Sequence, residues 1–298
     1  MNILLTGGSG FLGKKLGVAL MQAGHRVHNL DVKPCALFPT TQVDILDQFS
    51  ILPYFHEVDA VFHLASYIEA GESVEKPEKY IKNNILGTLS VLEAMRRSGV
   101  KKFLFSSSAA VYGEPIRVPI KEDDRTIPIN PYGMTKLAME GLVSSYVASY
   151  GMTGVALRYF NLYGPGEDHE PETHAIPRFI SQIMQDKEVT VWGEGLNLRD
   201  YIYIDDVVRA HLLALELQDG YQYMNLSGQR STSVIDVIHL LEKILGKQAN
   251  IRFFPPRPGD PMELYADSSK AGKVLGWQAE VGIEEGLRKT VDWFMRGK

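Results

Sequence analysis

The sequence lacks the features that mark secreted, membrane-spanning and nucleic-acid-binding proteins. Its 298 residues include one cysteine, Cys35, so an internal disulfide is excluded and a reducing compartment, the cytoplasm, is expected. No apolar run reaches the ~18 residues that a membrane span needs, and a first strand that begins at residue 2 leaves no room for a signal peptide. The net charge is −5 and no basic block is present, which argues against nucleic acid and anionic membranes as partners.

Short apolar runs that alternate with amphipathic stretches organise the chain. The runs, which we interpret as β-strands, lie at residues 3–5, 27–30, 42–43, 61–64, 103–105 and 155–158. Helices are expected near 77–98 and 132–150, where apolar residues recur every three or four positions. This alternation predicts an α/β fold with a doubly wound, Rossmann-like parallel sheet that is covered by helices on both faces.

A glycine-rich turn directly follows the first strand. Gly7, Gly10 and Gly13 stand between that strand and an apolar-periodic segment that ends at Gly24. Glycines here permit a tight turn and let backbone N–H groups approach a pyrophosphate at the N-terminus of the following helix. The spacing is G-x-x-G-x-x-G rather than G-x-G-x-x-G, but the strand–turn–helix context predicts a dinucleotide site.

The second strand discriminates between the two common dinucleotides. It ends in Asp31, where a carboxylate would bind the adenosine ribose hydroxyls. A carboxylate at this position disfavours a 2′-phosphate, and the nearby Lys33 argues in the other direction. We expect NAD rather than NADP.

A second group of residues predicts oxidation chemistry. Tyr132 and Lys136 lie four residues apart, so on a helix their side chains share one face, and Ser108 lies in a serine-rich segment upstream. An ammonium close to a phenol favours the phenolate, and a pKa lowered by about three units corresponds to roughly 4 kcal/mol. Tyr132 would then accept the proton of a substrate hydroxyl while hydride leaves for a nicotinamide. A Tyr-x-x-x-Lys pattern also occurs in exposed helix pairs, so this prediction depends on the dinucleotide site.

The alternation of strands and helices is interrupted twice in the second half of the chain. The first interruption runs from Gly164 through Thr173, and the second covers residues 253–260. We therefore expect an NAD-binding domain over residues 1–160, with a return near 196–220. The remainder of 161–298 is expected to form a smaller, interleaved and non-contiguous α/β substrate-binding domain.

Seven motifs extend over most of the chain, at residues 7–13, 63–66, 105–113, 132–136, 157–161, 197–206 and 257–260. Their content and order resemble those of the extended short-chain dehydrogenases/reductases, and within them the nucleotide-sugar epimerases of the UDP-glucose (UDP-galactose) 4-epimerase type. The resemblance implies an isomerase of carbohydrate metabolism that uses NAD to invert C4 of a UDP-hexose through a transient 4-keto intermediate.

The resemblance also assigns residues to the ligands. For NAD it implies contacts from Gly7, Gly10, Phe11, Leu12, Gly13, Asp31, Asp44, Ile45, Leu64, Ala65, Ser66, Asn83, Ser106, Tyr132, Lys136 and Tyr159. For the UDP-sugar it implies contacts from Ser108, Asn161, His174, Ala175, Arg199, Tyr201, Arg257, Asp260 and Leu264. The two arginines, in segments of loop-like composition, suit a diphosphate because guanidinium groups match phosphate oxygens in charge and geometry. No metal site is expected, since the histidines and acids of residues 169–174 lack helical metal-ligand spacing.

Two alanines narrow the reaction. Dehydratases of this family carry an acid pair between the catalytic Ser or Thr and the Val-Tyr-Gly sequence, and decarboxylases carry a glutamate just before it. This chain has Ala109 and Ala110 there, and an alanine side chain neither donates nor accepts a proton. Epimerisation is therefore favoured. The open alternatives are a uronic acid or pentose 4-epimerase, a 4-keto-sugar reductase and a non-catalytic NAD-binding protein, the last disfavoured by intact Ser108, Tyr132 and Lys136.

Two further positions and two helices bear on specificity, cofactor binding and assembly. Leu264 stands where relatives line the sugar pocket, and its intermediate size leaves UDP-galactose and UDP-N-acetylgalactosamine both open. Ile68 stands where relatives often carry a lysine near the cofactor. The helices near 77–98 and 132–150 resemble those that pair in a four-helix dimer interface, so a homodimer is expected.

Overall fold

Two contact-defined units make up the structure, a computed structural model that describes residues 1–167, 174–218, 220–256 and 261–297. The first unit comprises Met1–Gly113, Asp124–Arg158 and Val208–Met224. The second unit comprises Glu114–Asp123, Tyr159–Val207 and Asn225–Lys298.

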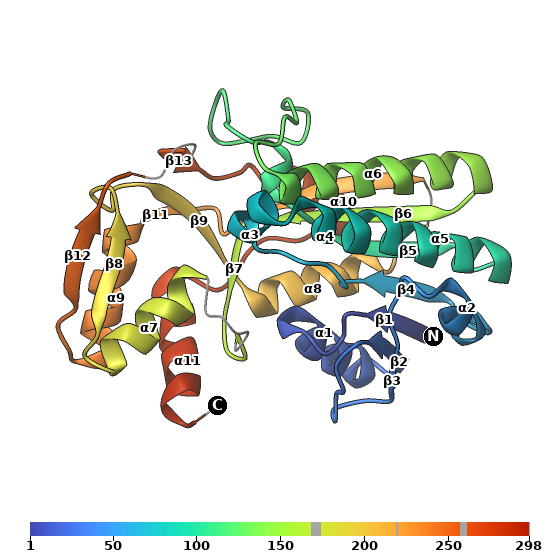
Figure 1. Cartoon of the computed structure of the whole chain (residues 1–298), viewed down its shortest axis with the longest axis horizontal. Helices are drawn as coiled ribbons and strands as arrows, with labels where there is room; N and C mark the ends of the chain where they lie inside the picture. Colours follow the sequence, from blue (N-terminus) through green and yellow to red (C-terminus); the bar gives the residue numbers. More distant parts are fainter. Residues whose placement is uncertain (168–173, 219, 257–260, 298) are drawn as a thin grey trace. The chain divides into compact units, whose positions relative to one another are not determined.

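The apolar runs of the first unit form a seven-stranded sheet, which confirms the predicted fold class (Figure 1). In spatial order the strands are β10 (Tyr221–Leu226), β6 (Thr153–Tyr159), β5 (Lys102–Ser108), β4 (Ala60–His63), β1 (Asn2–Thr6), β2 (Arg26–Asp31) and β3 (Thr40–Gln42). The pairs from β5 to β3 are parallel. The chain order reverses between β1 and β4, and open α/β sheets bind ligands at such a point, beyond the carboxyl ends of the strands.

Helices cover both faces of this sheet. α1 (Phe11–Gln22) lies on one face, whereas α5 (Gly87–Ser98) and α6 (Pro131–Tyr150) run side by side on the other (Figure 1). The shorter helices of this unit are α2 (Gln48–Ile51), η1 (Leu52–Phe55), α3 (Ala70–Glu75), α4 (Pro77–Tyr80), η2 (Ile81–Leu86) and η3 (Ala109–Val111). Apolar side chains from β1, β4 and β5 pack against those of α5 and α6, and the main ones are Leu4, Val61, Phe103, Phe105, Val91, Met95, Met139 and Val143.

One predicted helix is divided into three parts. The segment expected as a helix near 77–98 consists of α4, the π-helical η2 and α5. Pro77 starts α4, where its missing N–H would be unbonded in any case, and Gly99 ends α5 in the left-handed conformation, with φ 78°. The π-helical stretch buries Asn84, which hydrophobic periodicity does not reveal.

The second unit contains two smaller sheets. β9 (Leu198–Tyr203) is the centre of the first and pairs with β7 (Asn161–Tyr163), β11 (Ser231–Ser233) and β13 (Glu263–Leu264). β8 (Glu188–Trp192) and β12 (Asn250–Phe254) form a parallel pair. The helices of this half of the chain are α7 (Ala175–Met184), α8 (Ile204–Ala214), α9 (Val234–Leu245), α10 (Ser269–Leu275) and α11 (Ile283–Met295). Among the helices in the described ranges, none has the length and apolar content required to cross a bilayer.

Residues 114–123 belong to the second unit, although they lie inside the segment 1–160 that we assigned to the NAD-binding domain. Ile120 explains the difference. Its N–H donates to the carbonyl of Tyr265 at 2.9 Å, and its carbonyl accepts from the N–H of Asp267 at 2.9 Å. Such long-range pairing leaves no trace in local sequence patterns. The domain boundaries that we expected stay a prediction.

Buried hydrogen bonds converge on His63, which is 1% exposed. Its Nδ1 lies 2.7 Å from Thr6 Oγ1, and its Nε2 lies 3.0 Å from Thr88 Oγ1. The hydroxyl of Thr88 donates to the carbonyl of Asn84, so it accepts from Nε2–H and the ring is the Nε2–H tautomer. Burial, followed by the charge of Lys136, lowers the pKa of His63 to about 3.

We predict that His63 makes folding stability sensitive to mild acid. Because the folded-state pKa is about 3 and the ordinary value is 6.5, the unfolded chain takes up a proton in this interval that the folded chain does not. The stability that depends on neutral His63 is fully present above pH 6.5. As the pH falls from 6.5 toward 3, the free energy of unfolding decreases by about 1.4 kcal/mol per pH unit. In thermal unfolding, the loss of stability of His63→Asn relative to wild type should be largest at pH 7.5 and smaller at pH 5. A constant deficit across this range would contradict the prediction.

Candidate active site

A close approach of two backbone segments forms the glycine-rich turn. Gly7 has φ +77°, and a Cβ on it would lie 2.5 Å from the backbone nitrogen of Ala65, in the segment that follows β4. A Cβ on Gly13 would lie 2.4 Å from the carbonyl oxygen of Gly7. Gly10 is the N-cap of α1 and supplies no capping side chain, so the first N–H groups of this helix stay open to an anion.

Asp31 lies beside this turn with its carboxylate held in place. Oδ2 accepts the N–H of Ser9 at 2.9 Å, and Oδ1 accepts the N–H of Lys33 at 2.9 Å. Each oxygen retains a lone pair for a ribose hydroxyl. An open helix N-terminus, a turn rich in glycine and a fixed carboxylate together fit a dinucleotide with a free 2′-hydroxyl.

The three predicted catalytic residues lie together in the first unit. α6 begins at Pro131, and its N-cap Asn130 accepts the N–H of Gly133 at 2.8 Å, which places Tyr132 in the first turn and Lys136 in the second. Lys136 is 1% exposed. Its Nζ donates to Ser66 Oγ at 2.9 Å and to the carbonyl of Ser106 at 2.8 Å.

Ser108 and Tyr132 are hydrogen-bonded through their side chains. The hydroxyl of Ser108 also accepts the N–H of Ala110 at 3.2 Å, which fixes it at the end of β5. The strand end and the helix start therefore present a hydroxyl, a phenol and an ammonium in one place, as the sequence motifs predict.

The protonation states differ from our expectation. We predicted that Lys136 lowers the pKa of Tyr132, and this is wrong for the interactions within the described chain. Desolvation, together with the negative charge of Glu69, raises the pKa of Tyr132 to about 12 against the opposing effect of Ser108. Burial lowers the pKa of Lys136 to about 7, against the opposing charge of Glu140. The Nζ of Lys136 lies 5.9 Å from the centre of the Tyr132 ring, and desolvation outweighs attraction at this distance.

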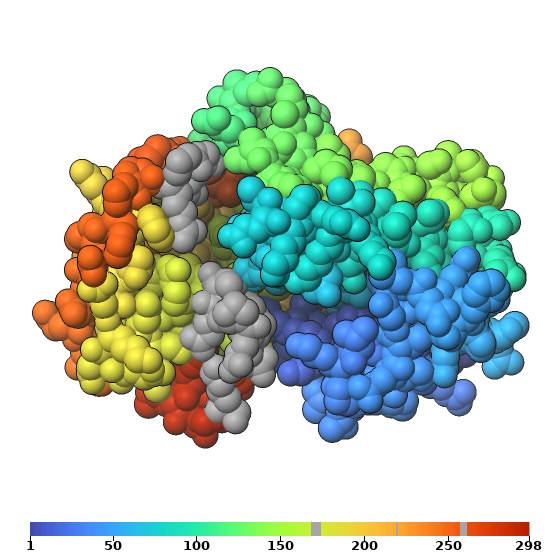
Figure 2. All heavy atoms as spheres, viewed as in Figure 1, coloured from blue at the N-terminus to red at the C-terminus, as the bar shows by residue number. Residues whose placement is uncertain are grey.

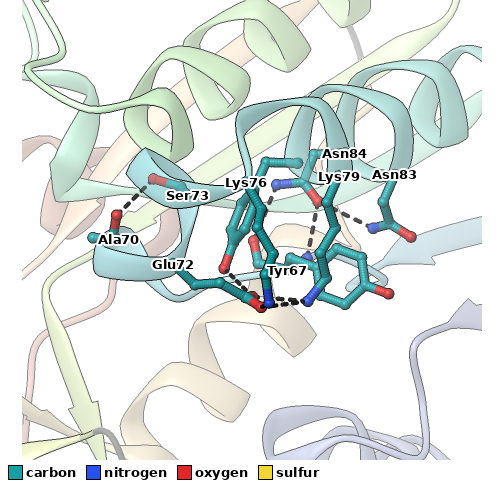
Figure 3. A network of polar contacts seen from close by, with 9 residues as sticks. Tyr67, Ala70, Glu72, Ser73, Lys76, Lys79, Asn83 and Asn84 are labelled. Carbon is teal, nitrogen blue, oxygen red and sulfur yellow. Dashed lines mark hydrogen bonds and ion pairs between the residues drawn. The ribbon is translucent and has the colours of Figure 1, made fainter.

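A polar network holds the segment that follows β4 (Figure 3). The side chain of Asn84 is hydrogen-bonded to both backbone groups of Tyr67. Its Oδ1 accepts the N–H of Tyr67 at 2.9 Å, and its Nδ2 donates to the carbonyl of Tyr67 at 3.0 Å. Glu72 accepts hydrogen bonds from Lys76 and Lys79. These contacts fix the chain on both sides of Ile68.

The same segment is fastened to the start of α6. The hydroxyl of Ser73 accepts the backbone N–H of Tyr132 at 3.1 Å and donates to the carbonyl of Ala70 at 2.6 Å. Nδ2 of Asn84 also donates to Thr135 Oγ1 at 3.0 Å. The loop that carries Ser66 is thereby held against the helix that carries Lys136.

The other predicted NAD residues fall into two groups. Leu64, Ala65, Ser66 and Ser106 lie at the ends of β4 and β5, next to the glycine turn or Lys136. Phe11 and Leu12 open α1 behind that turn. The remaining ones have local roles or lie elsewhere: Asp44 caps the N–H of Leu46, Ile45 belongs to the core, Asn83 donates to Asn84, and Tyr159 belongs to the second unit.

Four predicted substrate residues share one face of the small sheet in the second unit. Asn161 pairs with Tyr201 in the parallel register of β7 and β9, and Leu264 pairs with Arg199 in that of β13 and β9. Arg199 and Tyr201 are two residues apart on β9, so they point to the same side. Our expectation of a loop around Arg199 is wrong, because β9 is a strand that pairs with neighbours distant in sequence.

The rest of the predicted substrate residues are spread along this unit. His174 is the N-cap of α7, its Nδ1 is hydrogen-bonded to the buried Glu167, and Ala175 is the first helical residue. Arg257 and Asp260 lie outside the described residues.

Sequence reasoning missed four polar residues of the first unit. Asn84 and Ser73 hold the loop after β4, and Glu140 and Arg158 form a buried ion pair behind Lys136. A signal existed only for Glu140, which follows Lys136 by four residues and so lies on the same face of α6. The others are placed by contacts between distant segments.

We predict that Gly13→Ala removes bound NAD and lowers the melting temperature. The new Cβ would lie 2.4 Å from the Gly7 carbonyl oxygen and 2.5 Å from Gly8 Cα, and neither backbone atom can move without opening the turn. Gly141→Ala is the matched control, because a Cβ there meets nothing within 4 Å and should stabilise α6 by about 0.5–1 kcal/mol. The NAD content is measured from the nucleotide released on denaturation, and the melting temperature from thermal unfolding. Full NAD content in Gly13→Ala would refute the proposed cradle.

Comparison with known proteins agrees with this geometry. The model of the NAD dependent epimerase/dehydratase family matches residues 3–226. A UDP-glucose 4-epimerase of Halalkalibacterium halodurans is 39% identical, over 98% of this chain and 95% of its own length. The crystal structure of Thermotoga maritima UDP-glucose 4-epimerase with UDP-glucose superposes with a TM-score of 0.95, at 36% identity and with 99% of each chain covered. A UDP-N-acetylglucosamine 4-epimerase from Methanobrevibacter ruminantium M1 has a TM-score of 0.93, at 31% identity, with 100% of this chain and 99% of that chain covered. The chain belongs to the NAD-dependent epimerase/dehydratase family.

Proposed function

We propose that this protein is an NAD-dependent isomerase that inverts C4 of a UDP-hexose, interconverting UDP-glucose and UDP-galactose through a transient 4-keto sugar. The observation that carries the proposal is the chain of contacts that joins the glycine cradle to the catalytic residues. Gly7 abuts Ala65, the adjacent Ser66 accepts from Lys136, and the neighbouring Tyr132 is hydrogen-bonded to Ser108. These contacts support a nucleotide site and an acid–base site that adjoin each other in the first unit.

The residues would divide the work as follows. NAD, held by the glycine turn, Asp31 and Lys136, supplies the hydride acceptor when bound, and later the hydride donor. Tyr132 accepts the proton of the C4 hydroxyl and returns it after the keto sugar has presented its other face. Ser108 donates a hydrogen bond to O4 in both directions. Because the surrounding protein keeps the pKa of Tyr132 near 12, loss of its proton needs added positive charge, which a nicotinamide cation brings.

The absence of a further acid favours epimerisation over elimination. Ala109 and Ala110 form the short turn η3 directly after Ser108, and Ala109 is buried. A dehydratase requires a proton donor and acceptor near this position, and neither alanine can act as one.

We assign the UDP moiety to the second unit. The sheet face with Asn161, Arg199, Tyr201 and Leu264 offers an amide, a guanidinium and a phenol side by side on adjacent strands. Arg199 would bind the diphosphate, and Leu264 would line the sugar pocket. His174, Ala175, Arg257 and Asp260 complete this proposal from the sequence motifs. A leucine is compatible with both plain and N-acetylated hexoses, so we propose activity on both pairs.

We further propose a cytoplasmic homodimer. Figure 2 shows that α5 and α6 reach the surface of the first unit next to each other. Exposed apolar side chains at these helices include Leu86 at 48%, which ends η2 just before α5, and Met134 at 40% and Tyr150 at 42% on α6. Light scattering during size-exclusion chromatography should give twice the mass of the chain, and Leu86→Glu should shift this toward the single-chain mass. A wild-type protein of single-chain mass at micromolar concentration would exclude the dimer.

The function is tested by incubating purified protein, without added cofactor, with UDP-glucose and separately with UDP-N-acetylglucosamine. We expect both to equilibrate with their 4-epimers, resolved by chromatography. Tyr132→Phe should retain NAD and lose activity by about 10²–10⁴-fold, because it removes the proton-transfer group. Tyr146→Phe is the matched control, since Tyr146 lies on the same helix and bonds to Glu93 away from the site. Consumption of added NADPH without epimer formation would identify a reductase instead.

A further inference from the structure

Three successive residues at the end of β5 attach to three successive turns of α6. The carbonyl of Ser106 accepts from Lys136, and the side chain of Ser108 is hydrogen-bonded to Tyr132. Between these two attachments, the hydroxyl of Ser107 donates to Glu140. Tyr132, Lys136 and Glu140 are spaced four residues apart, so they lie along one face of the helix.

The proposed chemistry gives roles to Tyr132 and Lys136 but none to Glu140. It is 5% exposed, and its partner Arg158, at the end of β6, is 4% exposed. Arg158 Nε donates to Oε1 at 2.8 Å, and Nη2 donates to Oε2. A two-point pair of this kind fixes the orientation of the carboxylate as well as its position.

Two further contacts hold the side chain of Arg158 in place. Its Nη1 donates to the hydroxyl of Tyr112 at 2.9 Å, and its guanidinium lies 4.6 Å from the centre of the Tyr223 ring. Tyr112 belongs to the segment just after Ser108 and Tyr223 to β10. Glu140 is therefore bonded directly to Ser107 and is connected through Arg158 to β6, to Tyr112 and to Tyr223 on β10.

We propose that Glu140, held by Arg158, is a positioning residue for epimerisation that sets the register of α6 against β5 through Ser107. The inference rests on the proposed function. On β5 the residue of the Ser107–Glu140 bond stands between the residues that contact Lys136 and Tyr132, and on α6 the bond lies one turn beyond Lys136. A shift at this bond displaces the end of the strand along the helix and so moves the phenol relative to the Ser108 hydroxyl. Proton transfer is sensitive to such displacement. The residues proposed to bind the UDP moiety belong to the second unit and take no part in this bond.

Two variants test this role with little disturbance of the buried charges. Ser107→Ala removes only the bond between strand and helix and leaves the Glu140–Arg158 pair intact. Glu140→Asp keeps the negative charge beside Arg158 but shortens the side chain by one methylene, so the carboxylate is withdrawn from both Ser107 and Arg158. Each should reduce kcat for UDP-glucose about 5–20-fold, with KM within twofold of wild type and with bound NAD retained.

Thr153→Val is the matched control. Thr153 is also buried, starts β6 at the opposite end from Arg158, and donates its hydroxyl to the carbonyl of Gln218 in the same unit. It should show wild-type kcat, whatever its melting temperature. If Ser107→Ala and Glu140→Asp lose stability but keep wild-type kcat in the folded protein, or if KM rises in parallel with the fall in kcat, the positioning role is excluded. An inactive wild-type protein would refute the proposed function instead, so the two failures are distinguishable.

Discussion

The buried ammonium of Lys136 is the constraint on which the first unit depends. Its Nζ has hydrogen-bond acceptors at the ends of two neighbouring strands, Ser66 after β4 and Ser106 on β5. An ammonium removed from water is stable only where such acceptors are fixed in advance. The strand order, the loop after β4 and the first turns of α6 must therefore all be in place before this side chain can be buried. The same contacts therefore determine both the fold of the first unit and the geometry of its candidate site.

The electrostatic state of the site follows from the same burial. Desolvation moves the two partners toward neutrality, with the pKa of Tyr132 raised to about 12 and that of Lys136 lowered to about 7. With a pKa of about 12, Tyr132 is a protonated phenol at neutral pH and must be deprotonated before it can accept a proton from the substrate. Charge brought by ligands, rather than a permanent ion pair within the protein, then controls when the proton moves.

Local patterns in the sequence were sufficient for the elements that carry the chemistry. The first strand, the glycine turn and α1 follow from residues within about twenty positions of each other, and the helical spacing of Tyr132 and Lys136 is visible directly. The contacts that arrange these elements were not accessible. Asn84 reaches back to Tyr67, Ser107 reaches forward to Glu140, and Ile120 pairs with Tyr265. Arg199 was misplaced in a loop for the same reason, because a short strand flanked by polar residues is recognisable only through its partners β7, β11 and β13.

The π-helical stretch Ile81–Leu86 changes the direction in which side chains point between α4 and α5. Its wider turn accommodates one residue more than an α-helix would over the same length, so the two flanking helices are rotated relative to each other by about 100° compared with an uninterrupted helix. This offset lets the N-terminal part bury Tyr80 and the stretch itself bury Asn84, while α5 keeps Val91 and Met95 in the core. The number of residues between Tyr67 and α5 is therefore fixed by geometry on both sides. Loss of a single residue here would turn α3, and the Ser73 hydroxyl that receives the Tyr132 N–H, away from α6.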